Sequence, residues 1–182
     1  MEEYKQWISQ PQTLLWIEGS LGTGKSTLMR SLVNTLSGTE HALVLKHFFA
    51  AGGESLQNSL EGFLRSVLFQ ILSQQPEALQ SLTHFRQLPS GAPNLGIIHL
   101  HELFIEALLE LSKANMSIFL LVDALDECVD WCKYNSWDFQ DFVSTTIAES
   151  RSLNIQFHLC ISSRLTLDLE DFASNISTHP NQ

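Results

Sequence analysis

The sequence predicts an α/β fold, a three-layer sandwich with a parallel central sheet of four or five strands, and three observations lead to this prediction. A glycine-rich loop stands between a short apolar run and a helical pattern, and it consists of Gly19, Ser20, Leu21, Gly22, Thr23, Gly24, Lys25, Ser26 and Thr27. A second apolar run, 118–122, ends in the carboxylate of Asp123. Elsewhere apolar runs alternate with amphipathic helical patterns, which is typical of a parallel sheet covered by helices.

The glycine-rich loop fits the phosphate-binding pattern G-x-x-x-x-G-K-[ST] and has the flanks that this pattern requires. Residues 13–18 before it are apolar and β-prone, and the apolar residues after it recur at helical spacing as far as Gly38. Such a loop turns backbone N–H groups toward phosphates, and the helix N-terminus adds its unpaired donors. We expect Lys25 to reach the β- and γ-phosphates and Ser26 to offer its hydroxyl to Mg²⁺. The nine residues of the loop therefore predict a P-loop NTPase and its nucleotide-binding segment.

The composition indicates a globular protein without a broad basic surface. Of the 182 residues 44% are hydrophobic and 16% are charged, which favours one packed domain over a disordered chain. The formal net charge is −10, so neither nucleic acid nor an anionic membrane is an expected partner. No run approaches the roughly 20 apolar residues of a membrane span, and the acidic start is unlike a secretory signal. We expect a cytoplasmic protein.

The cysteines and histidines do not predict a metal centre of their own. The chain has an odd number of cysteines without zinc-finger spacing, namely Cys128, Cys132 and Cys160. We therefore interpret them as reduced thiols. The seven histidines also lack ligand spacing, because His99 and His101 are two apart and no H-E-x-x-H motif follows. The expected metal is therefore the Mg²⁺ that accompanies a nucleotide.

Periodicity gives the remaining elements and the domain boundaries. The predicted strands are 13–18, 41–49, 118–122 and 155–161. The predicted helices are 2–9, the stretch from the glycine loop to Gly38, 56–72, 100–111 and 139–147. Loops are expected at 89–94 and 131–136. We expect an N-terminal helical segment at 1–12, a nucleotide-binding domain at 13–173 and a polar tail at 174–182.

The acidic residues after the third predicted strand are candidate site residues. The run 118–122 lacks polar alternation, as expected for a central parallel strand, and Asp123 stands where that strand should end. Ligands of parallel α/β sheets bind at the carboxyl ends of the strands, so Asp123 is expected to act as the Walker B carboxylate that holds Mg²⁺. Asp126 and Glu127 follow within one turn, near enough to orient or deprotonate a water. The alternative for these three residues is a solvated acidic loop.

Arg164 follows the fourth predicted strand at its carboxyl end. A guanidinium at this place can sense or neutralise a γ-phosphate. A plain surface arginine is the alternative, and the residues alone do not decide between the two.

Four segments taken in this order resemble the NACHT class of STAND signalling NTPases, particularly the fungal NLR-like proteins. The segments are LLWIEGSLGTGKSTL from Leu14, HFF from His47, IFLLVDALDEC from Ile118 and LCISSR from Leu159. The glycine loop alone marks only a P-loop NTPase. More specific is the small residue Ala124 directly after Asp123, followed by the acidic pair.

The resemblance implies roles for the site residues and an order of the strands. It implies that Lys25 and Ser26 contact phosphates and Mg²⁺ and that Asp123 completes the Mg²⁺ shell. It further implies that Glu127 with Asp126 handles the attacking water and that Arg164 is the sensor 1 arginine. The strand before Arg164 is expected between the P-loop strand and the Walker B strand.

The sequence also departs from this family. Leu21 and Leu165 stand where such proteins often have proline. The chain ends soon after Arg164, which leaves no room for the helical and winged-helix modules that cover the nucleotide in this family. An excised domain and a natural short form are both compatible with this length.

Two functions compete at this stage. The first is a nucleotide-binding switch domain with weak Mg²⁺-dependent NTP hydrolysis, which controls assembly with protein partners or by self-association. The second is a stand-alone phosphotransferase of the nucleotide-kinase type, but its lid needs several arginines, whereas here the arginines are scattered at 30, 65, 86, 151 and 164. The residues do not decide whether the nucleotide is ATP or GTP. The absence of an N-K-x-D motif favours ATP, while the resembled family includes GTP users.

Overall fold

The computed structural model describes residues 2–50, 52, 56–77, 82, 95–130 and 138–164. The predicted loops at 89–94 and 131–136 and the predicted tail at 174–182 lie outside these residues. Residues 165–173 of the predicted nucleotide-binding domain lie outside them as well.

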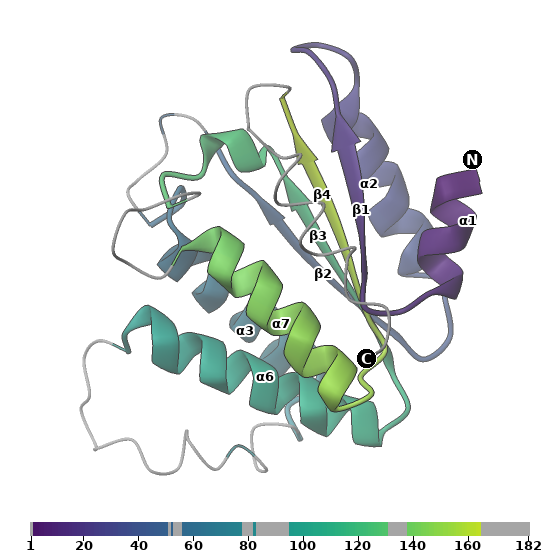
Figure 1. The fold of residues 1–182 in the computed structure, drawn as a ribbon, viewed down its shortest axis with the longest axis vertical. Coiled ribbons are helices and arrows are strands. Elements are labelled where there is room, and N and C mark those ends of the chain that lie inside the picture. Colours follow the sequence, from purple (N-terminus) through teal and green to yellow (C-terminus); the bar gives the residue numbers. More distant parts are fainter. Residues whose placement is uncertain are drawn as a thin grey trace.

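The described residues form a sheet of four parallel strands in the order β1-β4-β3-β2 (Figure 1). The strands are β1 (Thr13–Glu18), β2 (Ala42–Phe48), β3 (Ser117–Asp123) and β4 (Phe157–Ser163). Strand β4, which precedes Arg164, thus lies between the P-loop strand and the strand that ends in Asp123, as expected. Because all four strands are parallel, their carboxyl ends meet at one edge of the sheet.

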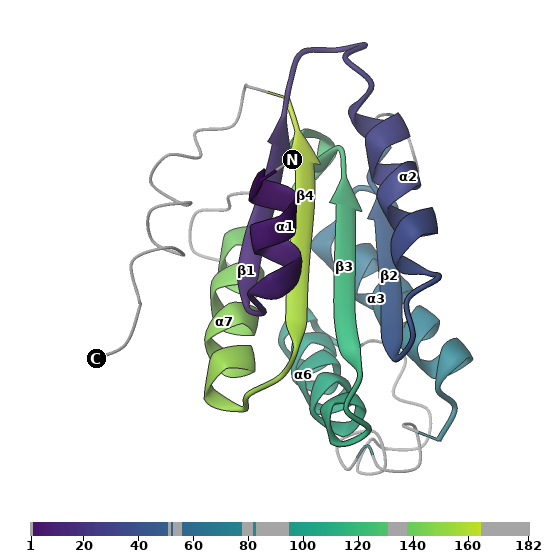
Figure 2. The ribbon, with the colours of Figure 1, turned by 90° about the vertical axis from the view of Figure 1, so that its right-hand side faces the viewer.

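Helices cover both faces of this sheet, so the predicted three-layer α/β sandwich is confirmed (Figures 1 and 2). One face carries α1 (Glu2–Ser9) and α2 (Lys25–Leu36). The opposite face carries α3 (Leu60–Gln74), α6 (Ile97–Lys113) and α7 (Phe139–Ser152).

Strand β3 shows why a central strand lacks polar alternation. Its residues Ile118, Leu120 and Val122 pack into the core shared with α3, α6 and α7. The intervening Phe119 and Leu121 pack into a second core shared with α1 and α2. Both faces of the strand are therefore buried away from water. This packing supports β3 up to its last residue, where the site begins.

Helix α1 is fixed to the sheet by one tryptophan. The side chain of Trp7 is 3% exposed, and its indole donates a hydrogen bond to the Leu159 carbonyl at 3.0 Å. The Trp7 carbonyl lies 3.0 Å from Nδ1 of His158, whose ring stacks on Phe119. Residues 2–9 of the predicted N-terminal helical segment thus pack on the sheet as α1.

The predicted boundaries of three elements need correction. Strand β4 begins at Phe157 instead of Ile155, because the Ile155 N–H donates to the Ser150 carbonyl at 2.8 Å and closes the end of α7. It also continues to Ser163, two residues further than expected. Helix α3 begins at Leu60 instead of residue 56, since the Ser59 hydroxyl caps it by accepting from the Gly62 N–H at 3.1 Å. Strand β2 begins at Ala42 instead of residue 41, because His41 adopts a positive φ of 56°, and it ends at Phe48 instead of residue 49.

Candidate functional site

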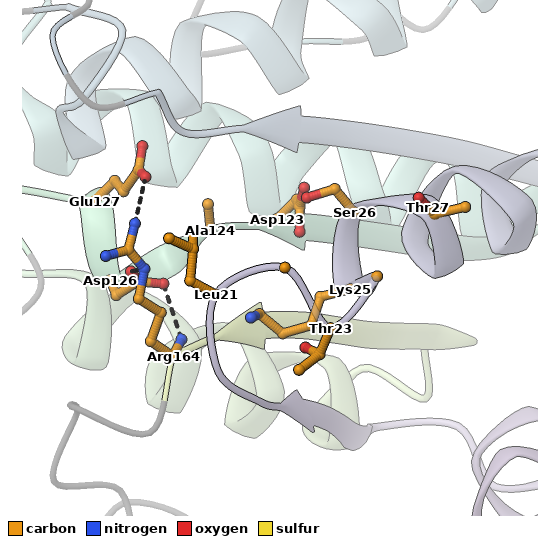
Figure 3. A pocket seen from close by; sticks show the side chains of 12 residues that line it. Leu21, Thr23, Lys25, Ser26, Thr27, Asp123, Ala124, Asp126, Glu127 and Arg164 are labelled. Carbon is orange, nitrogen blue, oxygen red and sulfur yellow. Dashed lines mark hydrogen bonds and ion pairs between the residues drawn. The ribbon is translucent and has the colours of Figure 1, made fainter.

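A cavity of about 340 Å³ opens at the carboxyl edge of the sheet and brings the predicted site residues together (Figure 3). Its walls come from the P-loop residues 21–27, from residues 123–124 and 126–127 after β3, and from Arg164 after β4. Gly19 and Ser20 of the predicted nucleotide-binding segment are not part of the lining. They lie directly behind it, where their carbonyl groups contact Lys25.

The P-loop takes its shape from two glycines. Gly22 and Gly24 have φ values of 79° and 91°, in the left-handed region that other residues rarely adopt. The hydroxyl of Thr23 donates to the Ser20 carbonyl at 2.8 Å and fastens the loop from within. Helix α2 begins immediately afterwards, so its unpaired N–H groups open toward the cavity wall formed by residues 24–27.

Lys25 is folded back over its own loop. Its ammonium nitrogen donates to the carbonyl oxygens of Gly19 at 2.5 Å and of Ser20 at 3.0 Å. The positive charge thus lies at the mouth of the backbone cradle. A phosphate that enters must exchange these two carbonyl contacts for its own oxygens, and a charge-assisted hydrogen bond to phosphate favours that exchange.

Asp123 and Ser26 form an oxygen-donor set in the same cavity (Figure 3). Asp123 is the last residue of β3 and is 4% exposed, whereas Ser26 belongs to the first turn of α2. Among the described residues no group of three or more His, Cys, Asp or Glu side chains could hold a metal by itself. A single carboxylate with a hydroxyl fits Mg²⁺, which usually takes its other ligands from water and substrate phosphates.

The turn after Asp123 directs two further carboxylates back to the cavity. Ala124 adopts the left-handed conformation, with φ 57° and ψ 47°, and is followed by the short helix η1 (Leu125–Glu127). Leu125 is fully buried in the core and anchors this turn. A small residue suits position 124, because bulky or β-branched side chains are strained in this conformation.

Arg164 holds both of these carboxylates. Its backbone N–H donates to Asp126 Oδ1 at 3.0 Å, and its Nε lies 3.0 Å from Asp126 Oδ2. A terminal guanidinium nitrogen lies 3.4 Å from Glu127 Oε1 (Figure 3). The side chain is 43% exposed and lines the cavity, so Arg164 is part of the site and not an unrelated surface arginine.

Two serines that the sequence reasoning overlooked connect these parts. Ser162 and Ser163 are fully buried at the end of β4. The Ser162 hydroxyl donates to Asp123 Oδ1, and the Ser163 hydroxyl accepts from the Trp16 indole N–H at 2.9 Å. Two small polar residues at the carboxyl end of an apolar strand were the available signal.

The thiol of Cys160, next to this site, is unreactive. Burial, together with the nearby negative charge of Asp123, raises the pKa of the Cys160 thiol to about 12. Its sulfur lies 3.7 Å from the Met29 sulfur in the core beneath α2. A thiol with this pKa stays protonated and serves as packing. Among the described cysteines Cys128 is also buried, while Cys132 lies outside the described part.

A comparison with models of protein families shows the family of this chain. The model described as "Nephrocystin 3, N-terminal" matches residues 1–164. The chain belongs to this family. This nephrocystin 3 N-terminal family domain is also 31% identical over 132 residues to the vegetative incompatibility protein HET-E-1 of Podospora anserina. That alignment covers 70% of the chain and 10% of the relative, so the chain spans about a tenth of the relative's length.

Two solved structures share the fold of the nephrocystin 3 N-terminal family domain. The Cdc6p protein of Pyrobaculum aerophilum superposes with a TM-score of 0.57 at 16% identity, over 97% of this chain and 41% of Cdc6p. A Walker-type ATPase of Pyrococcus abyssi superposes with a TM-score of 0.52 at 15% identity, over 89% of this chain and 43% of the other. The predicted resemblance to a NACHT-type P-loop NTPase domain of fungal NLR-like proteins is thereby confirmed. In the part of the chain that the structure describes, no helix is long and apolar enough to cross a membrane.

Proposed function

We propose that this domain binds a nucleoside triphosphate with Mg²⁺, hydrolyses it slowly, and acts as a switch that controls assembly of an NLR-like protein. The observation that carries the proposal is the single cavity in which a P-loop, a buried carboxylate, an acidic pair and an arginine meet. Family membership and the P-loop ATPase fold support the nucleotide.

Binding is assigned to the P-loop and to Asp123. The N–H groups of the loop and of the first turn of α2 surround the phosphates, and Lys25 leaves the Gly19 and Ser20 carbonyls to reach the β- and γ-phosphates. Ser26 and Asp123 offer oxygen ligands to Mg²⁺. When bound, Mg²⁺ neutralises charge on the phosphate oxygens.

Hydrolysis is assigned to the acidic pair and Arg164. Glu127, with Asp126 beside it, orients or deprotonates a water near the γ-phosphate. The guanidinium of Arg164 contacts both carboxylates. A γ-phosphate competes with Glu127 for that guanidinium, and a shift of Arg164 toward phosphate frees Glu127 to act on water. The need for this exchange supports a slow rate in the isolated domain.

The switch role is supported by what surrounds the cavity. Leu21, which lines the cavity, is an apolar residue that is 79% exposed. An apolar side chain exposed at the edge of the site is available to pack against another protein surface. The relative HET-E-1 is a vegetative incompatibility protein of which this chain matches only a tenth, which supports a regulatory part within a larger assembly.

The arginines of the described residues favour the switch over a nucleotide-kinase type phosphotransferase. Arg65 pairs with Glu61 on the surface of α3, and Arg151 donates to the Gln12 carbonyl. Only Arg164 of the described arginines lines the cavity. A second phosphorylated substrate would need more than one such guanidinium.

The identity of the base and the location of the protein are finer parts of the proposal. Both ATP and GTP suit a site defined by phosphate and Mg²⁺ contacts, and the sequence favours ATP because no guanine-reading N-K-x-D motif is present. A cytoplasmic location agrees with the buried thiol of Cys160.

The decisive experiment is a calorimetric titration of the purified chain with ATP and with GTP, each with and without Mg²⁺, while phosphate release is followed in parallel. We expect saturable binding that Mg²⁺ strengthens, with slow release of phosphate. Absence of binding by both nucleotides would overturn the proposal. Rapid transfer of phosphate to an added nucleoside monophosphate would instead establish the phosphotransferase.

A further inference from the structure

We infer that Ser162 is a positioning residue that orients Asp123 for Mg²⁺ and fixes the turn that carries the acidic pair. This inference rests on the proposed function. It adds to the site a buried hydroxyl that does not line the cavity and would not itself touch nucleotide or metal.

The geometry centres on one atom. The Ser162 Oγ donates its hydrogen to Asp123 Oδ1 and accepts the Ala124 N–H at 3.2 Å. A serine hydroxyl has one hydrogen and two lone pairs, so both contacts are compatible at the same time. One side chain thus ties the proposed metal carboxylate to the first residue of the left-handed turn.

Sheet register explains why a residue of β4 can do this. Ile161 of β4 pairs with Val122 of β3, so Ser162 stands level with Asp123. Ile161 and Val122 both enter the core beneath α3, α6 and α7. Because successive side chains of a strand point to opposite faces of the sheet, Ser162 and Asp123 point to the other face, where α2 and the P-loop lie.

The consequence for the site is a carboxylate with a fixed orientation. Asp123 is 4% exposed, so water cannot readily replace a lost partner at Oδ1. With Oδ1 committed to Ser162, the lone pairs that remain on the carboxylate are available to Mg²⁺ in a fixed direction. Partners of this kind behind a metal ligand typically contribute about 10- to 100-fold in metal affinity.

The chain offers a matched control next to Ser162. Ser163 is equally buried at the end of the same strand, but its hydroxyl contacts the Trp16 indole at 2.9 Å. Ser163→Ala removes a buried hydroxyl of the same kind from the same strand without touching Asp123. It therefore reports the general effect of such a deletion.

The experiment measures the Mg²⁺ dependence of ATP binding by calorimetry, in EDTA and over a Mg²⁺ series, for wild type, Ser162→Ala and Ser163→Ala. We expect Ser162→Ala to need about 10-fold more Mg²⁺ for half-maximal strengthening, while its affinity in EDTA stays at the wild-type value. Ser163→Ala should keep the wild-type Mg²⁺ dependence. If GTP proves to be the nucleotide that binds, it replaces ATP in the same design.

A second pair of variants keeps the test decisive if Ser162→Ala does not fold. Ser162→Thr retains the hydroxyl and Ser162→Val replaces it with a methyl of similar size, so this pair isolates the hydrogen bonds. We expect the threonine variant to keep the Mg²⁺ dependence and the valine variant to lose it. Equal Mg²⁺ dependence in wild type and Ser162→Ala, or in the Thr and Val variants, would overturn the role of Ser162. Failure of wild type to bind nucleotide would refute the proposed function instead.

Discussion

Lys25 differs from an ordinary surface lysine because two carbonyl groups of its own loop hold its ammonium at the cavity. We predict that Lys25→Ala weakens triphosphate binding by about 10- to 100-fold, since hydrogen bonds to charged groups contribute about 1.5–3 kcal/mol. The fold should remain intact because the side chain lies at the surface of the site. Calorimetry of the variant against wild type measures the effect.

Lys5→Ala supplies the control for this prediction, since Lys5 is an exposed residue of α1. It should bind nucleotide like wild type. Equal affinity of Lys25→Ala and Lys5→Ala would show that the P-loop does not hold the phosphates.

Asp123 and Glu127 are expected to act in different steps, Asp123 in Mg²⁺-dependent binding and Glu127 in hydrolysis. Asp123→Asn should reduce the Mg²⁺-dependent part of nucleotide binding, because an amide is a weaker ligand for a hard cation than a carboxylate. Glu127→Gln should leave binding in place and lower hydrolysis by about 100-fold or more, since it removes a proton acceptor for water. Binding assays and single-turnover phosphate release measure the two effects separately. An equal loss of binding in both variants would contradict the division.

At the scale of single residues, the sequence predicted the groups whose position follows from a motif. Lys25 and Ser26 are fixed by the P-loop pattern, and Asp123 is fixed by the end of an apolar strand. Ser162 could not be assigned in this way, because its role depends on β4 lying beside β3. The contact between Arg164 and Glu127 depends on the same adjacency.

Among the elements, strand β2 forms one edge of the described sheet and is protected there by a side chain. The Lys46 N–H donates to Gln70 Oε1 at 3.0 Å, and Gln70 Nε2 donates to the Lys46 carbonyl at 2.8 Å. The amide of Gln70, which belongs to α3, thus imitates a neighbouring strand. Covering an edge in this way hinders pairing with another chain.

We predict that Gln70→Ala lowers the free energy of unfolding by about 1 kcal/mol, which corresponds to a fall of about 2–4 °C in Tm. The two hydrogen bonds to Lys46 are lost, and water replaces them incompletely at the edge. Thermal unfolding measures the shift, with Gln74→Ala on the exposed side of the same helix as the control. An unchanged Tm in Gln70→Ala would show that the edge does not depend on this amide.

The elements also show where periodicity stops being informative. Strand β4 was predicted two residues too early, because Ile155 is apolar and fully buried although it belongs to the turn that closes α7. Its predicted end at residue 161 falls two residues short, because the apolar run stops at the polar pair Ser162 and Ser163. Their hydroxyl groups find partners in Asp123 and Trp16 instead, so tertiary contacts override the local pattern.

The stability of the whole molecule should fall in mild acid. Burial lowers the pKa of His47 and of His101 to about 4, from an ordinary value of 6.5. The unfolded chain therefore binds more protons than the folded chain between pH 6.5 and about 4. Each histidine contributes stability that is complete above pH 6.5 and is lost toward pH 4, with a slope of at most about 1.4 kcal/mol per pH unit.

Urea unfolding between pH 7.5 and 4.5 measures this slope. We expect His47→Gln to flatten it, whatever the stability of the variant at pH 7.5, because one proton-linked group is removed. His99→Gln is the matched control, since His99 is exposed. A slope unchanged in His47→Gln would exclude His47 as a contributor.

Turnover is also a property of the whole molecule. In phosphoryl transfer the protein supplies mainly position and charge neutralisation, and an added arginine can contribute about 10³- to 10⁵-fold in rate. Among the described residues Arg164 is the sole arginine at the cavity, and it is paired with Asp126 and Glu127. The cavity is also open at the edge where Leu21 is exposed. The described part thus presents the proposed phosphate cradle with little positive charge left to stabilise the transition state.

We therefore predict that the dilute monomer binds nucleotide but hydrolyses it well below the roughly 1 s⁻¹ at the lower end of typical enzymes. Any acceleration should come from contacts that another copy or a partner protein adds over the cavity, because these exclude water and supply further charge. Steady-state phosphate release measured over a 100-fold range of about 0.1 to 10 μM protein, with sedimentation in parallel, tests this expectation. The rate per molecule should rise only where self-association begins. Turnover at tens per second that is independent of protein concentration would contradict the switch and indicate a complete enzyme, because no surface from another molecule would then be needed.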